Sequence, residues 1–175
     1  MITNSNKIVD DISLYLKETA SKNNFLWFFD LHQKEVVKSA EALLEFYPKA
    51  DKNIVIIACW LHDIVHYHAN GEKEIEAVKE THHIEGAKMA EKFLLKYNID
   101  NNDINKIKKC IERHRNRPDY QPETIEEKIV AVSDTLSHYR SLFYFCYFKI
   151  YPNDSLELMA KKQSEKLERD WKDLV

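Results

Sequence analysis

The chain has 175 residues, of which 44% are hydrophobic and 31% charged, and its formal net charge is -3 at pH 7. This length suits one domain with a substantial buried core, and the composition excludes a largely disordered chain. The small negative charge gives no general attraction for a nucleic-acid duplex. The one basic cluster, residues 113–117, fits either a solvated helix end or a site for a small anion. We therefore expect a single domain over residues 1–175 and a small anionic partner.

No segment has the features of a membrane span or a secretion signal. The apolar runs Ile54–Leu61 and Leu142–Tyr151 fall short of the roughly 20 residues that cross a bilayer. Residues 1–6 lack the basic start and apolar stretch of a secretory signal. The three cysteines are widely spaced and odd in number, which indicates buried thiols in a reducing compartment. These features predict a cytoplasmic protein with no membrane partner.

The pattern of apolar residues predicts an all-α fold, a compact bundle of about six to seven helices. The chain has two glycines and four prolines, and no run alternates with the period of a strand. Apolar periodicity, N-cap residues and prolines set the helix ends. Helices are predicted over about residues 6–22, 28–47, 51–68, 81–97, from 101 or 102 to before 118, 122–151 and 155–174. Residues 69–80 fit either a helix or a mobile flap near the site.

Histidines and aspartates that could bind metal recur in a fixed order along the chain. They are His32, the adjacent pair His62 and Asp63, His82 or its neighbour His83, His114, and Asp134. Neutral imidazoles with carboxylates suit a first-row divalent ion such as Mn, Fe, Co, Ni or Zn. Ligands spread over about a hundred residues converge only where several packed helices meet. The sequence therefore predicts a site built by the whole fold.

The two aspartates strengthen this prediction because each interrupts a strongly apolar helix. Taken singly, a histidine or aspartate in a helix is more often a structural residue than a ligand. Burying several charges together without a cation is costly, however. The two oxygens of Asp63 can bridge two ions about 3.5–4 Å apart. In that arrangement the first ion is held by His32, His62, Asp63 and Asp134, and the second by His82, His114 and the other oxygen of Asp63.

The order H…HD…D, formed here by His32, His62 with Asp63, and Asp134, resembles the HD superfamily of metal-dependent phosphohydrolases. The resemblance spans about residues 27–139, and the additional histidines are similar to those of its dinuclear branches. It implies an HD-like core at 27–139, flanked by N- and C-terminal helices. It also implies one or two divalent ions, with Mg added to the metals named above.

The histidine pair at 82–83 is resolved by its spacing to Gly86. The segment from His82 to Ala87 resembles the family pattern H-x-x-x-G-A. Gly86 follows His82 by one turn on the same helical face and leaves that face open for close approach. His83 instead begins the apolar stripe that continues at Ala87. We therefore expect His82 to be the ligand, with His83 as a core residue or a neighbour of the ligands.

The chain departs from the familiar dinuclear pattern directly after the doublet. Many such members read HDIGK, whereas here Val65 and His66 stand where that pattern has glycine and lysine. The family's lysine is similar in role to a phosphate contact or proton donor, and an imidazole can donate a proton near neutral pH. We expect Asp63 and His66 to be catalytic, although His66 also fits a partly exposed residue at a helix end. His138, one turn after Asp134, is either structural or a neighbour of the ligands.

These features predict an enzyme that hydrolyses a phosphate ester or anhydride in a small molecule, most simply a nucleotide, with metal-activated water. Lys34, Arg115 and Arg140 are candidate phosphate contacts because each follows a predicted ligand closely. Two alternatives remain at this stage. One is a di-iron oxygenase on an HD scaffold, and the other is a non-catalytic metal- or nucleotide-binding module.

The aromatic run at residues 142–148 permits three interpretations. It can continue the core along the sixth helix, line a pocket, or form the surface of a homodimer.

Overall fold

The computed structural model describes residues 2, 5–69 and 72–174, and the regular elements in this part of the chain are all helical. The predicted all-α class is confirmed. The helices of the described residues outnumber the six to seven expected, because several predicted helices are interrupted. The α-helices are α1 (Ser5–Lys22), α2 (Leu26–Phe28), α3 (Lys34–Leu44), α4 (Lys52–Leu61), α5 (Glu72–Lys79), α6 (His82–Leu94), α7 (Asn101–Arg113), α8 (Ile125–Arg140) and α9 (Leu156–Leu174). The π segment η1 (Phe29–Gln33) and the 3-10 segments η2 (Ile64–His68) and η3 (Phe143–Lys149) complete the set.

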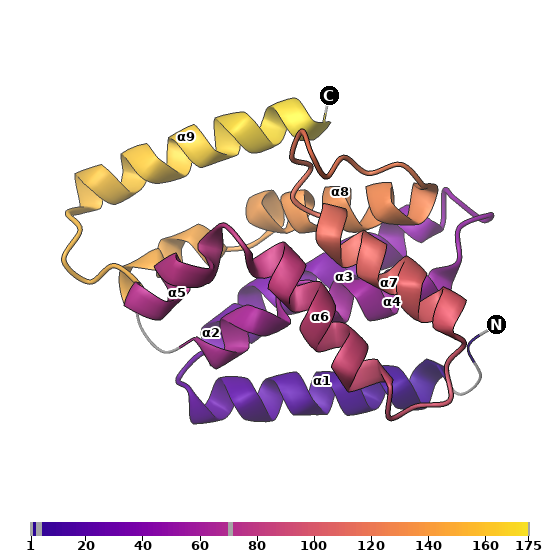
Figure 1. Cartoon of the computed structure of the whole chain (residues 1–175). Helices are drawn as coiled ribbons and strands as arrows, with labels where there is room; N and C mark the ends of the chain where they lie inside the picture. The colour runs from indigo at the N-terminus through magenta and orange to yellow at the C-terminus, as the bar shows by residue number, and fades with distance from the viewer. Residues whose placement is uncertain (1, 3–4, 70–71, 175) are drawn as a thin grey trace.

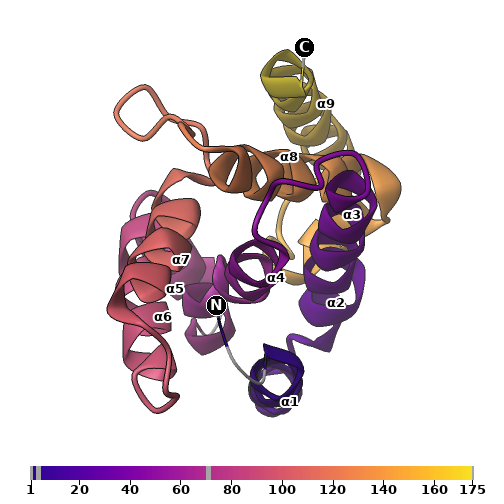
Figure 2. The ribbon, with the colours of Figure 1, turned by 90° about the vertical axis from the view of Figure 1, so that its right-hand side faces the viewer.

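Helix α4 lies in the middle of the bundle, with α1, α3, α8 and the pair α6 and α7 around it (Figure 2). Its residues 54–61 are all buried. A helix enclosed on every side is apolar all round, which explains its nearly continuous hydrophobic run. The Asp51 side chain accepts hydrogen bonds from the first free amides, those of Asn53 and Ile54, and so fixes where α4 begins.

The helix predicted over 51–68 is interrupted at the histidine and aspartate doublet. Helix α4 ends at Leu61, and Asp63 has φ -110° and ψ 22°, outside the α-helical region. The carbonyl oxygen of Cys59 then accepts two side-chain hydrogen bonds, from Gln33 and from the His62 ring. These bonds satisfy a carbonyl that the helix leaves without an intrahelical partner.

The helix predicted over 28–47 begins irregularly. Residues 29–33 form a π segment that contains His32 and Gln33, both buried. Gln33 donates from Nε2 to the Cys59 carbonyl at 2.6 Å, which ties this segment to the end of α4. Single π turns inside α-helices are frequent at functional sites, and here the turn positions His32.

The helix predicted over 122–151 is two elements. It starts at Ile125 rather than at Pro122, because Thr124 and Glu127 form a reciprocal capping box. Helix α8 ends at Arg140, and the extended Ser141 leads into η3. The Ser141 hydroxyl donates to the Ser137 carbonyl and accepts from a backbone amide of η3, which stabilises the break.

The remaining elements frame this core. Residues 72–79 form α5, so most of the segment left open between helix and flap is helical, and residues 70 and 71 lie outside the described part. Helix α7 begins after Asp100, whose side chain caps it in place of the expected Asn101 or Asn102. Helix α9 runs along the outer side of α8 (Figure 1). Among the described helices, none combines the length and apolar character that crossing a membrane requires.

Candidate metal centre

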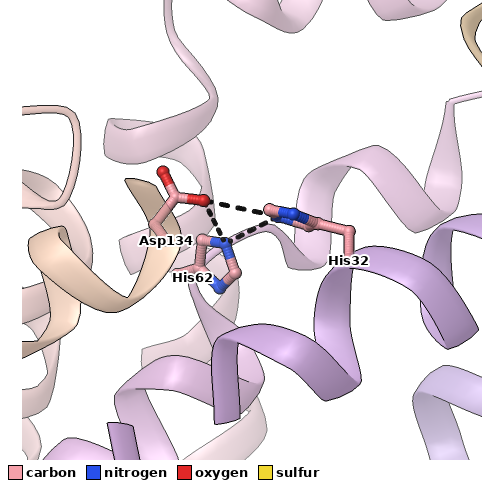
Figure 3. A group of neighbouring side chains, drawn as sticks. All are labelled: His32, His62 and Asp134. Carbon is pink, nitrogen blue, oxygen red and sulfur yellow. Dashed lines mark hydrogen bonds and ion pairs between the residues drawn. The ribbon is translucent and has the colours of Figure 1, made fainter. Parts of the chain in front are cut away.

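Three side chains from separate elements converge at one end of the centre, and we call them the first cluster: His32 of η1, His62 at the end of α4, and Asp134 of α8 (Figure 3). The Nε2 atoms of His32 and His62 are 3.3 Å apart. The Oδ1 atom of Asp134 lies 3.4 Å from the first of these nitrogens and 3.6 Å from the second. All three potential ligand atoms therefore point toward a common centre.

Asp63 lies between this group and a second cluster, formed by His66, His82 and His114. Its Oδ2 atom faces the first cluster, 3.2 Å from His32 Nε2 and 3.4 Å from His62 Nε2. Its Oδ1 atom faces the second cluster, 3.5 Å from His82 Nε2 and 3.8 Å from the Nε2 atoms of the other two histidines. The two oxygens of one carboxylate thus serve two groups of nitrogens.

Three of these histidines are oriented by backbone carbonyls three residues earlier. The Nδ1 atom of His62 is 2.8 Å from the Cys59 oxygen. The equivalent distances are 2.7 Å for His82 to the Lys79 oxygen and 2.7 Å for His114 to the Ile111 oxygen. A carbonyl can only accept a hydrogen bond, so Nδ1 carries the hydrogen and Nε2 is bare in each neutral ring. The carbonyls of helix ends, which lack helical partners, thereby aim the ligand nitrogens.

His32 is oriented by a side chain rather than by the backbone. Its Nδ1 atom lies 2.9 Å from the Ser137 hydroxyl, which donates its own hydrogen to the Asp134 carbonyl at 2.7 Å. The hydroxyl must therefore accept from His32 Nδ1, and Nε2 again faces the cluster without a hydrogen. Sequence reasoning missed Ser137. Its position three residues after Asp134 was the available signal.

The hydrogen-bond pattern leaves ligand atoms at the centre that a cation would bind. The Nε2 atoms of His32 and His62 face each other at 3.3 Å, and those of His82 and His114 at 3.2 Å, and in the neutral rings these atoms carry no hydrogen. Asp63 Oδ1 is buried and accepts no hydrogen bond from any described residue. Nitrogen and oxygen ligands bind first-row divalent ions at about 2.0–2.2 Å, so ligands of one ion lie about 3.0–3.4 Å apart. The donor set and its spacing therefore fit such ions.

The charges in the two clusters differ. Burial acts to raise the pKa of Asp63 and Asp134, but the surrounding histidines outweigh it and hold both carboxyl pKa values well below their usual range. In the second cluster, burial lowers the pKa of His82 to about 2 and that of His114 to about 4. His62 behaves in the opposite way, because the two aspartates raise its pKa well above the ordinary value despite burial. Ionised carboxylates and neutral imidazoles are the forms that bind metal, so a metal ion at the first cluster would replace the proton of His62.

Gly86 explains how α6 approaches the doublet. A Cβ atom at this position would lie 3.0 Å from the His62 carbonyl oxygen, closer than ordinary packing permits. The structure brings His82 to Asp63, whereas the His83 ring packs against Tyr120 with centroids 5.1 Å apart.

The predicted catalytic residue His66 lies at the second cluster. Its ring centroid is 4.7 Å from that of His82, and burial lowers its pKa. The positive charge of Arg115 also acts on His66. Arg115 donates to the Glu80 carbonyl at 3.0 Å and lies against the Glu80 carboxylate, so this guanidinium is held near the edge of the second cluster.

The other two predicted phosphate contacts, Lys34 and Arg140, form ion pairs with nearby carboxylates. Lys34 Nζ lies 2.6 Å from Asp30 Oδ1, and Arg140 Nε lies 2.8 Å from Glu35 Oε1. Neither pair includes a residue of the two clusters. A phosphate role for these cations remains a prediction.

Part of the aromatic run covers the first cluster. The Phe143 ring is buried and stacks on His32 with centroids 4.7 Å apart. Phe145 and Phe148, which follow later in the run, are exposed. The run therefore packs against the site at Phe143 and is exposed to solvent at Phe145 and Phe148. A homodimer surface at these residues remains a prediction.

Comparison with known proteins agrees with this geometry. The family model described as HD domain matches residues 29–138, more than half of the chain. Among curated proteins and solved structures, no match was found. The matched segment begins in η1 and ends in α8, and it contains every residue of the two clusters as well as Asp63. The chain therefore belongs to the HD domain family of metal-dependent hydrolases.

Proposed function

We propose that the protein hydrolyses a phosphate ester or anhydride of a small molecule, with a nucleotide as the substrate class. The observation that carries this proposal is the arrangement around Asp63, whose two oxygens face two separate pairs of bare imidazole nitrogens. Such an arrangement suits two divalent ions joined by one carboxylate, a recurring device for displacement at phosphorus.

The proposed ligands follow from the contacts described above. The first ion would be held by His32, His62, Asp63 Oδ2 and Asp134, and the second by Asp63 Oδ1, His82 and His114. An imidazole-rich set favours Mn, Fe, Co, Ni or Zn over Mg, which prefers oxygen ligands. When bound, these ions would lower the pKa of a water molecule and neutralise charge on the phosphoryl oxygens.

His66 and Arg115 supply functions that metal ligands do not. Burial favours the neutral form of His66, so its ring can accept a proton from water and return it to the leaving oxygen. Arg115 can exchange its contact with the exposed Glu80 carboxylate for a bidentate contact with a substrate phosphate. Both residues lie on the side of the second cluster, so they would meet the substrate phosphate from that side.

The test begins with metal analysis of protein purified without chelator, followed by a phosphate-release screen over nucleotides with each metal. Asp63→Ala removes the carboxylate shared by both clusters. We expect its metal content to fall to background and its turnover to fall on the order of 1000-fold. Asp30→Asn, which changes an exposed aspartate paired with Lys34, is the control. Full metal and full turnover in Asp63→Ala would refute the assignment.

The same screen separates the alternative functions. Phosphate release without oxygen, with Mn or Co, supports hydrolysis. Product formation that requires both oxygen and iron, with a mixed-valent spectroscopic signal, would identify a di-iron oxygenase instead. Tight ligand binding without turnover would identify a non-catalytic binding module.

A further inference from the structure

His138 lies between two carboxylates that come from different helices. Its Nδ1 atom is 2.9 Å from Asp170 Oδ2 of α9, and its Nε2 atom is 3.8 Å from Asp134 Oδ1 of the first cluster. Asp170 lies beyond residues 29–138, the segment that matches the family model. Helix α9 packs along α8 (Figure 1), and Asp170 meets the ring nitrogen of His138 that does not face Asp134.

Asp170 is a buried carboxylate with defined partners. It is 3% exposed although it lies on a strongly charged helix, and Lys166 pairs with its other oxygen. Burial acts to raise its pKa, but the hydrogen bond with His138 and the charge of Lys166 outweigh burial and lower it. Asp170 is therefore an ionised hydrogen-bond acceptor.

Two further contacts hold α9 in this position. Gln163 Nε2 donates to the Tyr144 carbonyl at 2.6 Å, and the Tyr139 hydroxyl donates to the Leu167 carbonyl. These bonds attach α9 to η3 and to the last turn of α8. The approach of Asp170 to His138 is thus part of a docked interface.

Ring stacking fixes the plane of His138. Its ring is nearly parallel to that of His32, at 5.5 Å and 12°, and to that of Phe143, at 5.6 Å and 14°. Within this plane, Nδ1 faces α9 and Nε2 faces the first cluster. The ring therefore has one side for Asp170 and one side for the centre.

We infer that Asp170 is a positioning residue that keeps the hydrogen of His138 on Nδ1, so that Nε2 is the nitrogen that acts on substrate at the first cluster. A carboxylate only accepts, as the backbone carbonyls do for His62, His82 and His114. At 3.8 Å from Asp134 Oδ1, Nε2 is beyond hydrogen-bond range and stays available to a polar group entering the centre. The C-terminal helix is thereby part of the active site. The kinetic consequence rests on the proposed phosphohydrolase function.

Long-range proton-nitrogen NMR of the ¹⁵N-labelled, Zn-loaded protein tests the hydrogen position without measuring activity. His138→Gln assigns the signals by their loss. We expect a hydrogen on Nδ1 in the wild type and, in Asp170→Asn, a shift of that hydrogen to Nε2, because the amide can donate to Nδ1. Glu168→Gln, the same change at an exposed position of α9, is the control and leaves the spectrum unchanged. A bare Nδ1 in the wild type, or an unchanged spectrum in Asp170→Asn, would overturn the inference.

Steady-state phosphate release tests the role on substrate. Asp170→Asn is expected to lower kcat about 10- to 100-fold, with KM and metal content near wild type. His138→Gln should show a similar loss, and the double variant should lose little more. Unchanged kcat in Asp170→Asn, or loss of metal in His138→Gln, would overturn the role. If the wild type releases phosphate from no compound, the proposed function fails, and the NMR result alone decides whether Asp170 positions His138.

Discussion

The two clusters of the centre are oriented by different means. In the second cluster, His82 and His114 are aimed by backbone carbonyls three residues earlier in the chain. In the first cluster, His62 is aimed in the same way, but His32 is aimed by the hydroxyl of Ser137, 105 residues away in sequence. The second cluster therefore depends on local helix ends, whereas the first depends in addition on the docking of α8 against η1. Side-chain substitutions far from the ligands should disturb the first cluster selectively.

The residues that surround the two clusters also differ. The first cluster is covered by the rings of Phe143 and His138, and α9 lies behind them. The second cluster has Arg115 and the exposed Glu80 at its edge. The first side is thus packed with aromatic rings, while the second has charged groups at its edge that could meet a phosphate.

The largest effects on the two clusters are expected when one ligand is removed from each. Under the two-ion proposal, His32→Gln and His114→Gln each lose one ion and keep the other, because Asp63 retains an oxygen for each remaining ion. We expect turnover to fall on the order of 100-fold or more in both variants, since each ion stabilises charge in the transition state. Elemental analysis gives the metal content. If either variant lost all metal, the two clusters would not bind independently.

A smaller effect, confined to the first cluster, is expected from Ser137 on α8. Ser137→Ala removes the hydroxyl that orients His32, and we expect metal affinity at the first cluster to fall about 10- to 100-fold. Ser133→Ala is a matched control, because Ser133 is equally buried, lies one turn earlier and donates only to the Ile129 carbonyl within its own helix. Metal titration should show a weaker class of site in Ser137→Ala alone. Equal weakening in both variants would show a general effect on α8.

The sequence predicts most of the scaffold because the core follows helical periodicity. The apolar run at 54–61 lies within a predicted helix, and the structure encloses it on every side. Apolar periodicity does not predict where side-chain hydrogen bonds interrupt a helix. The π turn at 29–33, the end of α4 before Asp63 and the break at Ser141 all depend on such bonds.

The same limit applies to the residues around the ligands. The ligand types and their order were visible in the sequence, because histidine and aspartate are conspicuous in apolar helices. Ser137 and Asp170 were not, since a serine after Asp134 or an aspartate on a charged helix is ordinary unless its partner is known. Their roles arise from contacts between residues far apart in sequence.

The smallest expected effect concerns stability in the chelator-treated protein. His82 and His114 have folded-state pKa values of about 2 and about 4 because they are buried. In the unfolded chain, each takes up a proton below about pH 6.5. As the pH falls from 6.5 to 5, the unfolded state therefore binds more protons and the folded state is destabilised. Each histidine contributes at most about 1.4 kcal/mol per pH unit, so we expect a loss of about 2–3 kcal/mol over this range.

Within the first cluster, His62 should contribute little to this slope, whereas His32 adds to it because burial lowers its pKa. The raised pKa of His62 gives a stabilisation that is present below about pH 6.5 and is lost as the pH rises through its folded-state value. Between pH 6.5 and 5 this ring is protonated in both states. Denaturant unfolding at several pH values should therefore show a shallower slope for His114→Gln and an unchanged slope for His62→Gln. Equal slopes in the wild type and His114→Gln would contradict the lowered pKa of His114, because a neutral buried His114 must cost stability as the unfolded chain gains protons.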